Sequence, residues 1–120
     1  MTKPREKGAV TVEFALILPV LLLIILAIVE YGIRYQRNAE FNNAAFIAAR
    51  SMAIHDSTAT ATAAAHAAGV PDTASIVIVP GACSPGTDVK VTISETEDSP
   101  TKAFGSTFFV DGVGVARCEE

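Results

Sequence analysis

Glu13 is the residue of this sequence whose surroundings most clearly require chemistry. It lies near the start of the run GAVTVEFALILPVLLLIILAIVE (residues 8–30), in which the residues from Phe14 to Val29 carry no charge. A carboxylate within hydrocarbon is costly, so it is expected to face a partner of opposite charge or to reach water. Two roles for Glu13 therefore stay open: an ion pair, or a place at the membrane surface where the carboxylate reaches headgroup water.

Cys83 and Cys118 are the two cysteines of the chain. Outside the cytoplasm the default state of such a pair is a disulfide. The loop it closes holds about 36 residues, and closing it is worth about 4 kcal/mol in the chain-entropy model. Two unrelated buried thiols are the alternative. A metal site is disfavoured because no histidine or further cysteine lies near either residue at ligand spacing.

Residue types that support catalysis are present, but not in catalytic patterns. His55 and His66 are separated by Asp56-Ser57, which predicts a helix boundary rather than one helix carrying both rings. No serine lies in a nucleophile elbow, and no glycine-rich phosphate loop follows a predicted strand. We therefore predict a protein that is not an enzyme, with no catalytic residue, no metal site and no cofactor.

The charge distribution argues against nucleic-acid binding. The net charge is −4 at pH 7, and removing residues 1–8, with three bases and one acid, leaves −6. Beyond Arg37 the basic residues occur singly, as Arg50, Lys90, Lys102 and Arg117. An acidic body without a basic patch has no electrostatic reason to bind a phosphate backbone.

The apolar run that surrounds Glu13 has the length of a membrane span. From Ala9 to Val29 a helix rising about 1.5 Å per residue extends roughly 30 Å, the hydrocarbon thickness of a bilayer. The preceding flank carries Lys3, Arg5 and Lys7 against Glu6, which predicts a cytoplasmic N-terminus and an extracytoplasmic C-terminal region. We expect a leader (1–8), a span (9–30), a continuation of the helix (31–54) and a small domain (55–120).

The helical pattern continues beyond the span. We predict one helix from about Val10 to about Ile54, with a kink or local loosening at Pro19, which cannot donate to the carbonyl of Ala15. Pro4 is expected to keep the leader out of the helix. An apolar stripe at helical spacing predicts the face that packs against the domain; its members are Phe41, Ala45, Ala48, Ala49 and Met52.

The remainder predicts a small α+β domain. Asp56 or Ser57 can cap a second short helix, which ends near Gly69 and Pro71. The period then changes to two, which predicts about three antiparallel strands packed on the long helix. The predicted strands are residues 75–79, 88–94 and 113–118; the acidic stretch 94–100 is expected to be a solvated loop, and 101–112 has no clear pattern.

The stretch KGAVTVE (7–13) resembles the class III signal of type IV pilin-like proteins. With the helix and strand-rich tail that follow, the chain resembles the TadE-like pseudopilins of tight-adherence (Flp) pili. The resemblance implies cutting between Gly8 and Ala9 by a prepilin peptidase, and Glu13 then pairs with the new Ala9 ammonium of its own or an adjacent subunit. It also implies other pilin or pseudopilin subunits and the pilus assembly platform in the membrane as partners. Small residues that allow close helix approach are Ala27, Gly32 and Ala39.

Two other readings of the sequence stay open. The first is a single-pass membrane anchor that carries a small extracytoplasmic binding module and needs no cut after Gly8. The second is a secreted domain released by conventional signal peptidase near Ala27, although the apolar run is long for such a signal. The N-terminal mass of the mature protein separates all three readings.

Overall fold

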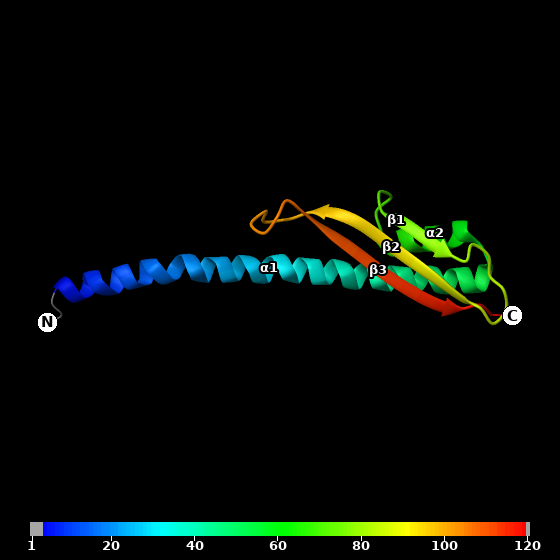
Figure 1. Ribbon diagram of the computed structural model, residues 1–120, viewed down its shortest axis with the longest axis horizontal. Helices are drawn as coiled ribbons and strands as arrows, with labels where there is room; N and C mark the ends of the chain where they lie inside the picture. The colour runs from blue at the N-terminus through cyan, green and yellow to red at the C-terminus, as the bar shows by residue number, and fades with distance from the viewer. Residues whose placement is uncertain (1–3, 120) are drawn as a thin grey trace.

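Residues 4–119, the part of the chain that the computed structural model describes, form two helices and three strands (Figure 1). In chain order these are α1 (Pro4–His55), α2 (Thr58–Ala67), β1 (Ser75–Val79), β2 (Asp88–Asp98) and β3 (Thr107–Arg117). The molecule measures 83 × 23 × 18 Å because α1 runs along its whole length, while α2 and the sheet pack on its C-terminal half. The predicted α+β fold is confirmed.

The long helix begins earlier than the sequence predicted. α1 starts at Pro4 instead of about Val10, so the prediction that Pro4 keeps the leader out of the helix is wrong. Proline suits the first helical turn, because its missing N–H would have no partner there and its φ is already helical. Residues 1–3, which include the predicted basic flank residue Lys3, and residue 120 lie outside the described residues.

The interior of α1 is continuous. The helix runs through Pro19 without interruption. Figure 1 shows a gentle curve along the N-terminal half of α1 and no sharp bend. The loosening predicted at Pro19 stays a prediction. At the other end α1 reaches His55, one residue beyond the predicted Ile54.

The second helix lies where its capping residues placed it. Ser57 is the N-cap of α2, and its hydroxyl accepts a hydrogen bond from the Thr60 amide at 3.3 Å. Asp56, at φ 47°, turns the chain between the helices. Gly69, at φ 105°, follows the end of α2 in a conformation that glycine adopts without strain. Ala61 and Ala65 are buried, so small side chains hold α2 close to α1.

The sheet is a meander of order β1-β2-β3 with antiparallel pairs. β1 matches its predicted bounds, but β2 and β3 are each 11 residues long and exceed the predicted 88–94 and 113–118. The prediction of an acidic loop at 94–100 is therefore wrong: Glu95–Asp98 pair with Thr107–Val110. Acidic residues have a low intrinsic preference for strands, and pairing with the distant strand β3 overrides this preference here.

The core lies between one face of α1 and the inner face of the sheet. The predicted stripe of α1 is confirmed, because Phe41, Ala45, Ala48, Ala49 and Met52 are all buried. β2 contributes the side chains of Val89, Val91 and Ile93, which are fully buried. α1 therefore contributes alanines between its two large buried side chains, Phe41 and Met52, and β2 contributes the branched side chains that fill the layer between them.

β3 packs against α1 through glycine. A Cβ added to Gly112 would lie 2.3 Å from the carbonyl carbon of Phe41, and one added to Gly114 would lie 2.3 Å from that of Ala45. Both contacts are with helix backbone, which cannot rotate away as a side chain does. The inner face of β3 therefore lies against the α1 backbone, while Val113 and Val115 point outward and are exposed.

Candidate functional site

The N-terminal half of α1 is an extended surface that no other element of the described chain covers. Every side chain from residue 6 to 29 is exposed except Ala27, which is half-buried. An 18-residue window of this helix has a mean hydropathy of 3.0, so the helix is long and apolar enough to cross a membrane. A surface this apolar requires lipid or other apolar helices as its surroundings.

The predicted processing and register residues lie at the start of this surface. Gly8 and Ala9 are within α1, and the Thr11 hydroxyl donates to the Lys7 carbonyl across the Gly8–Ala9 bond at 2.8 Å. Glu13 lies one turn after Ala9, is exposed, and has no hydrogen-bond or ion-pair partner within residues 6–119, whose side chains the structure describes. Its carboxylate is therefore free for a partner outside the described chain.

The other end of the apolar surface is marked by a second carboxylate, Glu30, which is fully buried. Arg34, one turn later on α1, donates to one of its oxygens at 3.3 Å and forms an i,i+4 ion pair with it. The hydroxyls of Ser99 and Thr101 donate to the same carboxylate, the second at 2.6 Å, and the Thr101 amide donates at 3.4 Å. Sequence spacing predicted neither of these partners, since both are about seventy residues away.

Polar contacts continue from Glu30 along the face of α1 that meets the β2–β3 hairpin. Arg37 forms ion pairs with Glu97 of β2 and with Glu40, each at 3.1 Å. Hydrogen bonds from Gln36 and from Arg37 lower the pKa of the Glu40 carboxyl. The Arg34 guanidinium also lies 5.0 Å from the centre of the Phe108 ring, a cation–π distance.

A further side-chain contact joins the edge of the sheet to α1. The Asn42 Oδ1 atom accepts a hydrogen bond from the Val113 amide at 2.9 Å. This amide points away from β2, so the asparagine satisfies a donor that an edge strand leaves open. The hairpin is thus held to α1 by charge near Glu30, by Asn42 in the middle, and by close backbone packing at Gly114.

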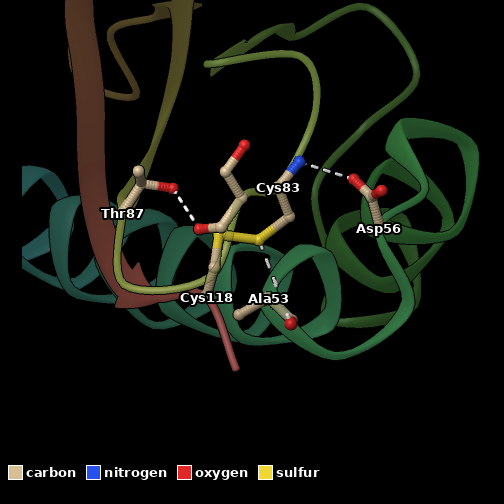
Figure 2. The surroundings of a disulfide bond; sticks show 6 residues. Ala53, Asp56, Cys83, Thr87 and Cys118 are labelled. Carbon is tan, nitrogen blue, oxygen red and sulfur yellow. Dashed lines mark hydrogen bonds between the residues drawn. A yellow bond between two sulfur atoms is a disulfide. The ribbon is translucent and has the colours of Figure 1, made fainter. Parts of the chain in front are cut away.

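Cys83 and Cys118 lie at disulfide distance, with Cα atoms 5.7 Å apart and the two sulfurs bonded (Figure 2). The predicted pair is confirmed at this distance. The Cys83 amide donates to Asp56 Oδ1 at 2.5 Å, and the Cys83 sulfur lies 4.0 Å from the Ala53 carbonyl oxygen (Figure 2). The Cys118 amide donates to the Thr87 carbonyl at 2.8 Å. The disulfide therefore joins the β1–β2 connection and the end of β3 beside the C-terminus of α1.

The two histidines make local contacts. The Nδ1 atom of His55 lies 3.1 Å from the Ser51 carbonyl oxygen, and that of His66 lies 3.0 Å from the Val70 carbonyl oxygen. His55 therefore contacts a carbonyl near the end of α1, whereas His66 contacts a carbonyl in the connection that follows α2. Residues 4–119 contain no group of three or more His, Cys, Asp or Glu side chains arranged to hold a metal ion.

One segment of the chain is similar to a known protein family. The family model described as TadE-like protein matches residues 8–50, which cover the apolar surface of α1 and the first part of its packed half. The predicted resemblance to TadE-like proteins is confirmed for this segment, and the class III signal stays a prediction. TadE-like proteins are components of the tight-adherence (Tad) pilus system. Neither a curated protein nor a solved structure matches the chain.

Proposed function

We propose that this chain, TadE-like over residues 8–50, is a pilin-like structural subunit of a tight-adherence pilus. A prepilin peptidase cuts it after Gly8, and the mature subunit joins the pilus, with other pilin or pseudopilin subunits and the membrane assembly platform, by helix packing. One observation carries the proposal. The family match begins at Gly8 and covers the same helix whose apolar side chains the domain leaves exposed.

The proposed topology follows from the basic flank and the apolar surface. Residues 1–8 are the leader, 9–30 cross the membrane, 31–54 continue the helix outside, and 55–120 form the extracytoplasmic domain. The N-terminus is cytoplasmic, because basic residues flank the span on that side. An extracytoplasmic domain also suits the Cys83–Cys118 pair, since disulfides persist in oxidising compartments.

The proposed cut changes the charge at the start of the helix. Cutting after Gly8 removes three bases and one acid and leaves one ammonium, on Ala9, a turn before Glu13. Glu13 has no partner within the described residues, so its carboxylate can form an ion pair with the Ala9 ammonium of its own or an adjacent subunit. A buried ion pair between subunits adds little stability but sets register, and this is the role proposed for Glu13.

Access to the scissile bond requires a local change in α1. The Gly8–Ala9 bond lies inside the helix, and the Thr11–Lys7 hydrogen bond spans it. Glycine costs about 1 kcal/mol relative to alanine in a helix, so the turn at Gly8 is the easiest in this region to open. We propose that the leader unwinds to enter the peptidase as an extended strand and that Gly8 makes this opening possible.

The test is intact mass spectrometry of the protein from its native membrane, with and without the prepilin peptidase. We expect a mature chain that begins at Ala9 only when the peptidase is present. Gly8→Val should leave a longer, membrane-retained chain that never joins a filament. Gly81→Val is the matched control, because a Cβ at Gly81 meets nothing within 4 Å and the site is remote from the cut.

A mature chain that still begins at Met1 or Thr2 in the presence of the peptidase would rule out the pilin proposal. The plain membrane anchor with an extracytoplasmic binding module would then be the better account. A chain that begins near residue 28 would instead indicate release by a conventional signal peptidase.

A further inference from the structure

The β2–β3 connection is a defined structure at the end of the apolar surface of α1. We call residues 99–106 the hairpin tip. The Ser99 amide donates to the Ser106 carbonyl at 2.9 Å and closes the tip, and the Lys102 amide donates to the Ser99 hydroxyl at 3.3 Å. Lys102, at φ 54°, and Gly105, at φ 128°, turn the chain. The tip is therefore an ordered turn with a fixed outer surface.

Glu30 fixes the height of the tip along α1. Ser99 and Thr101 both donate to this carboxylate, which is the first charge after the apolar run. Figure 1 shows the connection continuing past the strands along α1 toward its N-terminal half. Ala27, one turn before Glu30, is the half-buried exception on the otherwise exposed segment 6–29. The tip thus reaches the last turn of the apolar segment.

This height is the level of the lipid headgroups. A bilayer has about 30 Å of hydrocarbon inside a total thickness of about 40–45 Å, so each headgroup layer is roughly 5–7 Å deep. If residues 9–29 fill the hydrocarbon, the rise of three residue steps from Ala27 to Glu30 spans about 4.5 Å at its outer boundary. A tip that is held between the levels of Ala27 and Glu30 on α1 therefore lies within the headgroup layer.

The composition of the tip suits that layer. Phe104 is exposed, with 47% of its surface accessible, and Lys102 is the one charged residue among positions 99–106. The chain from residue 9 onward carries −6, so this cation differs from the acidic body behind it. On α1, Tyr31 and Tyr35 are exposed at the adjacent turns. Aromatic rings and lysine side chains are the residues that favour membrane–water interfaces.

We propose that the hairpin tip docks on the outer surface of the same bilayer that the helix crosses, with Phe104 at the headgroup–acyl boundary and Lys102 at lipid phosphates. This contact adds a second point of attachment and fixes the domain relative to the membrane until the helix leaves the bilayer. The docking of the tip rests on the membrane placement of α1 in the proposed function. A control variant on α1 therefore tests that placement separately from the docking.

The chain contains no tryptophan, so a single introduced tryptophan reports on its own position. The full-length protein is reconstituted in vesicles of phosphatidylcholine and phosphatidylglycerol, with or without acyl chains brominated near the headgroup. Phe104→Trp is the test variant. Phe109→Trp is the matched control, because Phe109 is also exposed but lies on β3 beyond the tip. Ile24→Trp, inside the outer half of the apolar segment, reports membrane insertion.

We expect Phe104→Trp to emit at shorter wavelength than Phe109→Trp and to lose most of its emission with brominated lipid, while Phe109→Trp responds to aqueous iodide instead. Quenching of Ile24→Trp but not of Phe104→Trp by brominated lipid would overturn the docking of the tip and leave the proposed function standing. An unquenched Ile24→Trp would overturn both.

A second pair of variants tests the role of Lys102 without altering the aromatic probe. In the Phe104→Trp background, Lys102→Glu should reduce lipid quenching in vesicles that contain phosphatidylglycerol. Lys90→Glu makes the same charge change on β2, where Lys90 is also exposed, and should leave the quenching unchanged. Equal quenching in both variants would overturn the assignment of Lys102 to lipid phosphates.

Discussion

Replacing Gly114 by alanine should loosen the sheet from the long helix. The new Cβ would lie 2.3 Å from the Ala45 carbonyl carbon and 2.3 Å from the Phe46 nitrogen, whereas ordinary contact begins at 3.4 Å. Both atoms belong to helix backbone, so neither moves without displacing α1. β3 must therefore retreat by about 1 Å, and a gap of this size removes a quarter to a half of each dispersion contact it opens.

The expected cost follows from this retreat. Forcing an extra methyl into a well-packed core costs about 1–3 kcal/mol. A small domain has a total stability of about 5–15 kcal/mol, so the loss is a substantial fraction of it. Opening of the α1–β3 contact should become roughly 5- to 150-fold more frequent.

Hydrogen exchange of the full-length protein in nanodiscs measures this opening directly. The Val113 amide is the reporter, because it donates to Asn42 of α1 rather than to β2. We expect its exchange to accelerate in Gly114→Ala and to stay unchanged in Gly81→Ala, where the new Cβ meets nothing within 4 Å. Equal protection of Val113 in the two variants would refute the argument that glycine permits the close approach.

Three other substitutions test separate contacts. Cys118→Ser should raise protease sensitivity after residue 70 and not before residue 50, because it frees the end of β3 but leaves α1 intact; equal sensitivity of wild type and variant on digestion would contradict this. Glu30→Ala should speed amide exchange of Thr101 by removing the acceptor of the tip, whereas Glu40→Ala, at an exposed ion pair of the same helix, should not. Glu13→Leu and Glu13→Gln should insert in the membrane but assemble poorly into filaments, and normal assembly of Glu13→Leu would favour the interfacial role.

The sequence predicted those features that depend on neighbouring residues. The apolar stripe from Phe41 to Met52 follows helical spacing, and Ser57 caps α2 through a bond three residues away. The alternation of Val89, Val91 and Ile93 identified the buried face of β2. Each of these signals lies within one element, so local periodicity and capping chemistry suffice to read it.

The sequence did not predict features that depend on distant pairing. Glu95–Asp98 look like a solvated acidic stretch until Thr107–Val110 lie beside them and Arg37 of α1 neutralises Glu97. Likewise, nothing near Glu30 in the sequence identifies Ser99 and Thr101 as its partners. Gly112 and Gly114 have a low intrinsic preference for strands. Only the position of the α1 backbone shows why a side chain is excluded at these two residues.

The close packing of β3 on α1 also explains how one chain combines a domain with a long apolar helix segment that the domain leaves uncovered. Glycines on β3 and alanines on α1 bring sheet and helix together at backbone distance, and the whole molecule is consequently only 23 × 18 Å across. The domain uses one face of α1, from Glu30 onward, and covers little of the helix before it. Every direction around Glu13 therefore remains open to another helix. The segment of α1 before Glu30, which the domain leaves uncovered, can approach a neighbouring helix within the roughly 8–10 Å of direct packing. Bulkier residues at Gly112 or Gly114 would therefore have two effects: they would loosen the sheet from α1, and they would make the subunit wider.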